Sequence, residues 1–125
     1  LFRSNSPELL NTAFQLKKEP RLFFAGQMTG VEGYLESAAS GLMVGLQVAR
    51  YVNDKAFIDF PKTTAHGALS HYVSEYEGSN FQPMNVNFGI MEPWRTKVRK
   101  KKEKNGLIAN RALEDLAKLI EAEFL

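Results

Sequence analysis

Residues 21–50 read RLFFAGQMTGVEGYLESAASGLMVGLQVAR, and this stretch decides the fold of the chain. Its four apolar residues from Leu22 to Ala25 predict a short strand that is covered on both faces. A glycine-rich corner follows, and the residues from about Gly33 to about Val52 predict a long helix. A buried strand, a tight turn and a helix N-terminus in this order present backbone N–H groups to a phosphate or an electron-rich ring. We therefore predict an α/β fold with a candidate ligand site at the corner.

The corner carries Gly26, Gly30 and Gly33 within eight positions. Their spacing, G-x-x-x-G-x-x-G, fits neither the dinucleotide fingerprint G-x-G-x-x-G nor the P-loop, which ends in Lys-Ser or Lys-Thr. Thr29 and Glu32 form the S/T-x-x-E pattern of a capping box, which supports a helix start here. An ordinary buried strand–helix unit without a ligand explains the same residues, so the pattern leaves both interpretations open.

Small residues lie along one side of the expected long helix. Gly41 and Gly45 are four positions apart, beside Ala38 and Ala39. A glycine inside a helix costs about 1 kcal/mol relative to alanine. We therefore expect close packing against another backbone as compensation.

The remainder of the chain is predicted to be helix and loop. Leu1 to Glu8 is expected to be a loop with a turn at residues 5–7. A second helix starts at Thr63 or Thr64, either of which can cap it, and runs to about Tyr76. Residues 78–89 are rich in Asn, Gly and Pro and predict a loop.

A third helical region is predicted after Pro93. It is expected to loosen around residues 105–106, where Asn and Gly adjoin, and to resume to the end of the chain. Its last part repeats apolar side chains at helical spacing, which predicts core packing. These side chains are Ile108, Ala112, Leu113, Leu116, Leu119 and Ile120.

Composition limits the class of protein. The chain has 125 residues and is 44% hydrophobic, which suffices for one domain with a core. It has no cysteine, which excludes disulfides and cysteine zinc sites and agrees with a cytoplasmic protein. No apolar run reaches the length of a membrane span and no signal peptide is evident, so no membrane contact is expected. Because the chain starts at Leu1 without a Met, we expect it to be part of a longer polypeptide.

Positive charge is concentrated in one segment. Seven cations occupy ten positions, with Glu103 as the single acid among them: Arg95, Lys97, Arg99, Lys100, Lys101, Lys102 and Lys104. Such a cluster can follow RNA phosphates and release their counterions. A solvated helix face is the alternative.

Two histidines and two asparagines are further candidates. His66 and His71 are five positions apart, which is not the i, i+4 spacing of a helical metal site, and no acidic partner is evident; we predict no metal. Asn85 and Asn87 are two apart, so in an extended loop both amides face one way and can bind the donor–acceptor edge of a pterin or uracil. Hydrogen bonding to the loop backbone is the alternative for both amides.

Several segments carry a family resemblance. Residues 25–50, AGQMTGVEGYLESAASGLMVGLQVAR, resemble the C-terminal flavin-binding segment of the folate- and FAD-dependent tRNA uracil-5-methyltransferases, the TrmFO family. The MnmG or GidA proteins, which modify the wobble uridine, share the looser pattern AGQ-x-x-G-x-x-GY-x-E. Residues 80–89, NFQPMNVNFG, resemble a segment characteristic of the methyltransferase branch, and residues 60–61, 63–65 and 69–72 also match it.

The resemblance implies a fold and a set of site residues. The chain is expected to be the C-terminal portion of a Rossmann-like FAD-binding domain, with a strand–corner–helix unit over about 1–62 and a helical and loop tail over about 63–125. Expected FAD-binding residues are Gly26, Gln27, Thr29, Gly30, Gly33, Tyr34 and Ser37. Expected folate or substrate residues are His71, Asn85 and Asn87. No catalytic residue is expected here, because the family's cysteine nucleophiles have no counterpart in this sequence.

The resemblance also implies an activity. The intact protein is expected to methylate C5 of the T-loop uridine in tRNA. Methylenetetrahydrofolate would donate the one-carbon unit, FAD would supply electrons, and NAD(P)H would reduce the flavin. The expected partners are tRNA and the remainder of the FAD-binding polypeptide, and the chain alone is expected to be inactive. The alternatives are an MnmG-type wobble-uridine enzyme and a non-enzymatic RNA-binding module.

Overall fold

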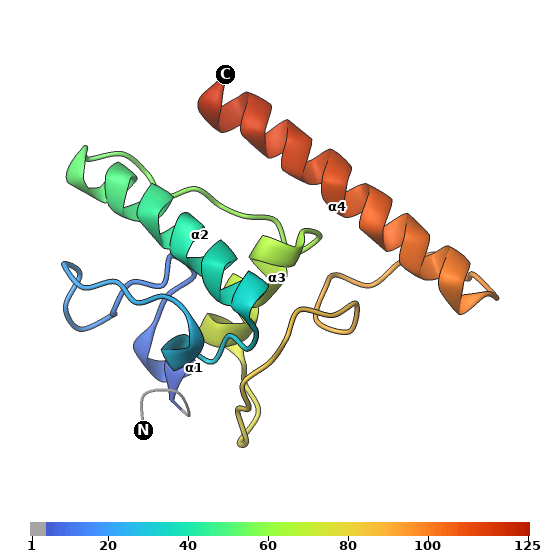
Figure 1. The fold of residues 1–125 in the computed structure, drawn as a ribbon, viewed down its shortest axis with the longest axis horizontal. Helices are drawn as coiled ribbons and strands as arrows, with labels where there is room; N and C mark the ends of the chain where they lie inside the picture. The colour runs from blue at the N-terminus through green and yellow to red at the C-terminus, as the bar shows by residue number, and fades with distance from the viewer. Residues whose placement is uncertain (1–4) are drawn as a thin grey trace.

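A computed structural model describes residues 5–125 of the chain. Its helices are α1 (Ser6–Leu9), α2 (Tyr34–Val52), α3 (Ala65–Glu75) and α4 (Lys101–Phe124), with a single 3₁₀ turn, η1 (Gln27–Thr29) (Figure 1). The expected N-terminal loop lies partly outside the described residues. Its turn at residues 5–7 is instead the start of α1, where Pro7 occupies the first turn and its missing N–H has no helical partner to lose.

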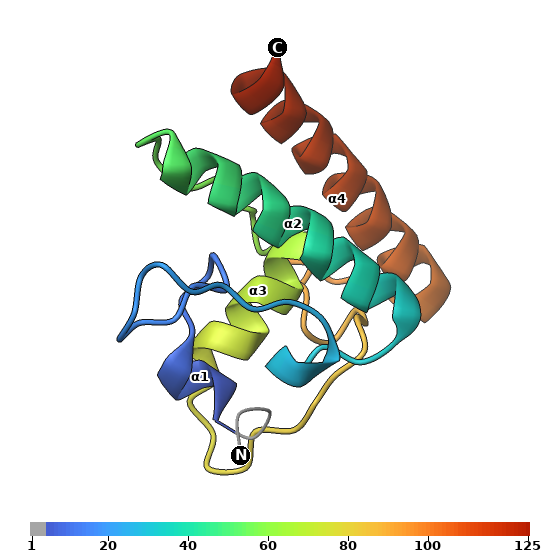
Figure 2. The same ribbon diagram turned by 60° about the vertical axis from the view of Figure 1, so that its left-hand side comes forward.

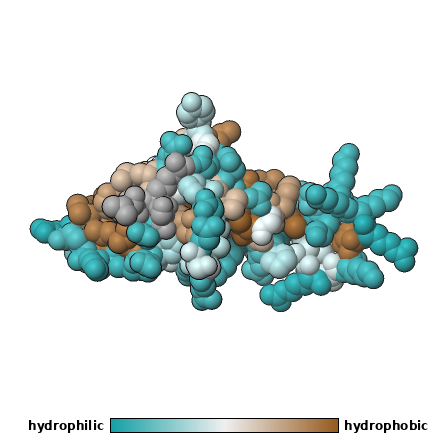
Figure 3. Space-filling model, turned by 90° about the horizontal axis from the view of Figure 1, so that it is seen from below, coloured by the Kyte–Doolittle hydropathy of each residue, from teal (hydrophilic) through white to brown (hydrophobic). Residues whose placement is uncertain are grey.

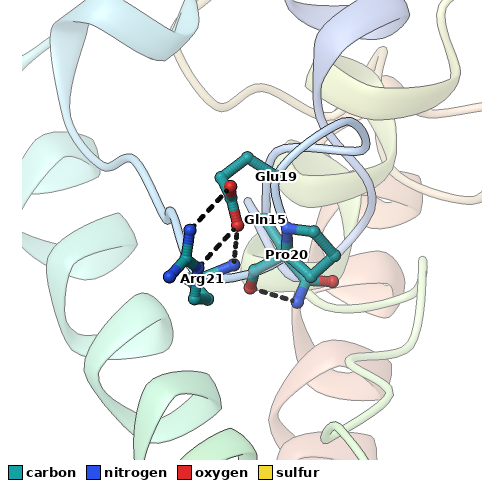
Figure 4. A network of polar contacts seen from close by, with 4 residues as sticks. All are labelled: Gln15, Glu19, Pro20 and Arg21. Atoms are coloured by element: carbon teal, nitrogen blue, oxygen red, sulfur yellow. Dashed lines mark hydrogen bonds and ion pairs between the residues drawn. The ribbon is translucent and has the colours of Figure 1, made fainter.

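The segment after α1 folds back on itself. Single antiparallel bridges join Leu10 to Leu16 and Gln15 to Phe23. The turn between them is closed by polar contacts: Gln15 Nε2 donates to the carbonyl of Pro20 at 2.8 Å, and the guanidinium of Arg21 pairs with Glu19 (Figure 4). Phe14, at the centre of this segment, is fully buried with a φ of 58°.

The predicted buried strand at Leu22 to Ala25 is not confirmed within residues 5–125. These residues are extended, but their only bridge is the one between Gln15 and Phe23, and Leu22 is 48% exposed. A strand needs a neighbour along its length to pair its backbone groups, and residues 5–125 supply only that single bridge. The described part of the chain is therefore helical with extended connections rather than α/β.

Helix α2 is confirmed to within one residue of the predicted start, and its two faces differ sharply. Ser40, Met43 and Gln47 recur every three or four residues and are buried. Gln47 uses its side-chain amide twice on Ile58, accepting from its N–H at 2.8 Å and donating to its carbonyl at 2.7 Å. This pair fixes the connection that follows α2.

The opposite face of α2 is exposed and largely apolar. Tyr34 is 98% exposed, Leu35 83% and Leu42 63%. Gly41 and Gly45 lie on this side, and an added Cβ at either would have open space around it. The expected close packing at these glycines is therefore wrong within residues 5–125.

Helix α3 starts as predicted at a threonine cap. The Oγ1 of Thr64 accepts from the N–H of Gly67 at 3.0 Å. A Cβ at Gly67 would lie 2.0 Å from the carbonyl oxygen of Pro61, so only glycine permits this approach. One face of α3 reaches the main core, which joins α1, α2 and the connections (Figures 1 and 2). Its buried members are Leu10, Phe14, Val31, Met43, Ile58, Phe60, Val73 and Phe81.

Helix α4 is continuous through Asn105 and Gly106, so the predicted loosening there is wrong. It extends along one side of the molecule (Figure 2). Ile108 forms a smaller buried core with Ala68 and Met91, and the partly buried Ala112 packs against it. An ion pair between Arg50 and Glu123 anchors the far end. No helix within residues 5–125 has the length and apolar character that crossing a bilayer requires.

The predicted core stripe on α4 is confirmed in part. Ile108 is 2% exposed, and Leu119 packs partly buried against the main core. Leu113 is 67% exposed and Ile120 44% exposed, so the prediction is wrong for these two. Helical spacing identified the apolar positions, but the described chain provides neighbours for only some of them.

Candidate functional site

The glycine corner has a backbone that only glycine adopts easily. Gly26, Gly30 and Gly33 have φ values of 78°, 94° and 93°. L side chains are disfavoured at such angles. Gly33 is the N-cap residue of α2, and no side chain caps this helix start. The corner therefore brings main-chain groups, unshielded by Cβ atoms, to the beginning of a nineteen-residue helix.

Two buried hydroxyl groups hold the corner in place. Thr29 is fully buried, and its Oγ1 donates to the carbonyl of Gly26 at 2.7 Å. Ser40 is 1% exposed, and its Oγ accepts from the N–H of Gly26 at 2.8 Å while donating to the carbonyl of Ser37. The predicted capping box is therefore wrong, because Thr29 lies in η1 and closes the corner instead of capping α2.

A distant loop completes the corner. Val31 pairs with Met84 in a parallel bridge. The N–H of Glu32 donates to the carbonyl of Met84 at 3.0 Å, and the N–H of Met84 donates to the carbonyl of Gly30 at 2.9 Å. The segment expected to bind FAD and the loop expected to bind folate or substrate are thus joined directly.

Asn85 and Glu36 form a side-chain link between these two segments. Asn85 Nδ2 donates to the carbonyl of Glu32 at 3.2 Å and to Glu36 Oε1 at 3.3 Å, and Val86 N–H donates to the same oxygen at 3.2 Å. The N–H of Glu36 itself, followed by Asn85 and Val86, lowers the pKa of this carboxyl. Sequence analysis did not assign Glu36 to the site, although it is the final Glu of the pattern AGQ-x-x-G-x-x-GY-x-E and lies in the first turn of the helix.

The two asparagines differ in their surroundings. The Nδ2 of Asn87 donates to the carbonyl of Asn85 at 3.0 Å, and its Oδ1 accepts from the N–H of Gly89 at 2.8 Å. Its amide therefore satisfies the loop backbone, which is the alternative that the sequence left open. Asn85, rather than Asn87, reaches the corner by hydrogen bonds.

The remaining expected cofactor residues border the corner with different exposure. Gln27 and Tyr34 are exposed, and Ser37 is half-buried in the first turns of α2. Met28, between Gln27 and the buried Thr29, is 47% exposed. The rim of the corner is therefore open and mostly uncharged.

His71 has an acidic partner that the sequence analysis did not identify. Its Nδ1 lies 2.8 Å from Glu75 Oε2, one helical turn further on, and Lys62 Nζ lies 3.0 Å from the same oxygen. His71, followed by Lys62, lowers the pKa of Glu75. His66 stacks on Phe60, and burial lowers its pKa. Over residues 5–125 no three His, Cys, Asp or Glu side chains form a group that could hold a metal ion.

All seven cations of the basic cluster are exposed. They occupy the connection before α4 and the first turn of that helix, and hydrophilic side chains project from this end of the molecule (Figure 3). Lys100 is the N-cap residue and makes no capping hydrogen bond. Cations at a helix N-terminus oppose the helix dipole, so a bound anion would relieve this arrangement.

A groove of about 660 Å³ lies beside the basic cluster. The connection from Asn87 to Trp94 forms one wall, and the first turns of α4 form the other. Lys101, Lys104 and Ile108 face it from the helix. The spacing of these three residues places them on one helical face.

Comparison with known proteins identifies the class to which the corner belongs. Residues 3–56, which include the corner and all of α2, match the family described as glucose inhibited division protein A. Curated relatives are similar over nearly the whole chain. A protein of Pelotomaculum thermopropionicum is 51% identical over 117 residues, covering 94% of this chain and 27% of the relative. A protein of Streptococcus agalactiae is 54% identical over 117 residues, covering 93% and 26%.

A protein of Enterococcus faecalis is 51% identical over 118 residues, again covering 94% of this chain and 27% of the relative. All three relatives are named methylenetetrahydrofolate–tRNA-(uracil-5-)-methyltransferase TrmFO. The chain is similar to TrmFO proteins over nearly its whole length, and the resemblance seen in residues 25–50 and 80–89 is confirmed. The chain spans about a quarter of the length of the curated relatives it matches.

Proposed function

We propose that this chain is one part of a flavoenzyme that methylates C5 of the T-loop uridine in tRNA, with methylenetetrahydrofolate as the one-carbon donor. The observation that carries this proposal is the junction of the glycine corner with the loop at Met84 and Asn85. This junction supports the proposal because it joins the residues proposed for the cofactor to those proposed for the substrate, in a chain about 50% identical to TrmFO proteins. Because tRNA is the substrate, we also place the protein in the cytoplasm.

The residues of the corner fit FAD. The positive φ angles at Gly26, Gly30 and Gly33 give the corner a tight backbone path that L side chains disfavour. The start of α2 has no side-chain cap, and its dipole favours negative charge on a neighbouring group. Gln27, Tyr34 and Ser37 complete the proposed lining, whereas the buried Thr29, expected there from the resemblance, supports the corner from within. Bound FAD would supply electrons to the reaction, with NAD(P)H as the source of reducing equivalents.

The exposed apolar face of α2 and the extended residues 22–25 fit the same proposal. In a Rossmann-like domain, residues 22–25 would pair with strands from elsewhere in the polypeptide. The unit over about 1–62 would then supply the flavin corner. The tail over about 63–125 would supply Asn85 and His71 for the folate or the uracil, while Asn87 holds the shape of the loop.

The basic cluster supports contact with tRNA. Seven exposed cations and an uncapped helix start form a site for a polyanion. Reversing the charge of Lys100, Lys101 and Lys102 in the full-length protein should weaken tRNA binding and reduce its dependence on salt. Charge reversal at Lys17, Lys18 and Lys55, which are exposed elsewhere, is the matched control. Equal effects of the two triple variants would contradict a specific RNA contact.

Two measurements test the proposed activity. The full-length protein should show the blue absorbance band of a flavin, which an RNA-binding module would lack. Mass analysis of tRNA from a deletion strain should show loss of the methyl group at the T-loop uridine. Loss of a modification at the wobble uridine instead would support an MnmG-type enzyme. Unchanged tRNA would contradict both activities.

A further inference from the structure

The groove between residues 87–94 and the start of α4 has the composition of a nucleotide site. One part is lined by Phe88, Met91, Trp94 and Ile108, and its rim carries Lys101 and Lys104. A more apolar part of about 350 Å³ continues along α4 and shares Phe88 and Met91 with the first. The first of these two neighbouring parts therefore combines flat aromatic side chains with two lysines.

Two aromatic side chains provide surfaces for a base. Phe88 is 43% exposed and lines both parts of the groove. The ring of Trp94 is held in position, because its Nε1 donates to Thr96 Oγ1 at 2.7 Å and the guanidinium of Arg111 lies 5.5 Å from its centre. Arg111 is itself fixed by hydrogen bonds to the carbonyls of Glu92 and Pro93. An aromatic wall that is already ordered loses little entropy on stacking with a base.

The charge at the rim favours an RNA strand over a protein segment as the occupant. Lys101 and Lys104 lie one turn apart at the groove, within the cluster of seven cations. An apolar protein segment would cover Phe88 but would leave these lysines close together without counter-charge. An unpaired nucleotide provides both parts, a base for the aromatic wall and phosphates for the lysines.

We propose that this groove binds an unpaired nucleotide of the RNA substrate, with the base against Phe88 and its phosphates at Lys101 and Lys104. The inference rests on the proposed function only in taking RNA as the substrate. It adds a second RNA contact, separate from the uridine that is methylated. This contact would select single-stranded over duplex RNA at this end of the molecule.

The test is binding of a short single-stranded RNA oligonucleotide to the full-length protein across a series of salt concentrations. Phe88→Ala should weaken binding about tenfold, because stacking on one aromatic side chain contributes at least a fivefold factor per base. Phe88→Leu should weaken binding to a similar extent, because leucine is apolar but lacks the flat ring on which the base would stack. The salt dependence should not change in either variant, because no phosphate contact is lost.

Lysine variants test the other half of the site. Replacing Lys101 and Lys104 by Gln should reduce the slope of affinity against salt by about one for each lysine. Phe124→Ala, a similarly exposed aromatic at the far end of α4, and Lys118→Gln are the matched controls and should have no effect. A single-stranded oligonucleotide should lose more affinity than a duplex in the Phe88 variants.

Unchanged affinity in both Phe88 variants would overturn the inference. Lower thermal stability without a change in RNA affinity would also overturn it, since that result shows a protein segment covering the groove. Failure of the proposed function has a different signature, namely a protein without flavin or without an effect on the T-loop uridine. Oligonucleotide binding does not depend on either of those readouts.

Discussion

The side-chain amide of Asn85 donates to the carboxylate of Glu36 at 3.3 Å, across a separation of 49 positions. The same oxygen accepts from the backbone N–H of Val86. This contact, with the bridge between Val31 and Met84, sets the position of the loop against the start of α2. The same contacts therefore position both the proposed cofactor residues and the proposed substrate residues.

The contacts that the Glu36 carboxylate makes with Asn85 and Val86 should be sensitive to acid. The pKa of Glu36 is lowered from 4.5 in the folded chain, so its contribution to stability is present above that value and is lost as pH falls through the folded pKa. Glu36→Gln should therefore remove part of the decline in melting temperature below about pH 4.5. Thermal unfolding followed from pH 7 to pH 3 measures this effect. Glu121→Gln, an exposed position near the end of α4, is the control and should leave the profile unchanged.

Ser40→Ala should loosen the corner. The substitution leaves the N–H of Gly26 without its acceptor, and a buried unpaired donor costs about 1–3 kcal/mol. We expect lower stability toward urea and weaker retention of flavin by the full-length protein. Ser74→Ala is the matched control, because Ser74 is similarly buried but donates only to a carbonyl within α3. Equal flavin retention in the two variants would show that Ser40 does not position the corner.

Gln47→Leu should destabilise the whole fold rather than the site. Leucine is of similar size, but it leaves both the N–H and the carbonyl of Ile58 unpaired in the core. Two such unpaired groups should lower the free energy of unfolding by about 2–6 kcal/mol. Urea unfolding measures the change. Gln82→Leu, at an exposed position, should change the free energy of unfolding by less than about 0.5 kcal/mol.

Glycine substitutions distinguish buried from open positions. Gly67→Ala should prevent normal folding, because its methyl group would overlap the carbonyl of Pro61. Gly45→Ala should stabilise α2 in the 125-residue chain by about 0.5–1 kcal/mol, since the position is open and alanine favours helix. In the full-length protein Gly45→Ala should not stabilise the fold if another backbone packs against Gly45. Circular dichroism melting of both proteins compares the two cases.

The sequence predicted those features that depend on nearby residues. The start of α2 at Gly33 and the cap of α3 at Thr64 follow from local backbone preferences, and both are confirmed. The continuity of α4 through Gly106 was missed, because one glycine costs little within a 24-residue helix. The strand at 22–25 was not confirmed, because an apolar run specifies burial but not the partner that would pair with it.

The site was predicted unevenly for the same reason. The glycines of the corner were identified because three of them fall within eight positions between an apolar run and a helix, and all three have positive φ angles. The junction of the corner with Met84 and Asn85, and the part of Glu36 in it, involves residues about fifty positions apart and has no local signal. The ion pair of His71 with Glu75 lies at i, i+4 and could have been found from spacing alone.

The parallel bridge between Val31 and Met84 also has a kinetic consequence. Closing a loop of this length carries an entropy cost that must be met before the contact contributes stability, and distant pairings of this kind form late in folding. The corner should therefore reach its final shape only after α3 has folded. Capture of a ligand there would be among the last events in maturation of the protein, which makes the added ligand a reporter of completed folding.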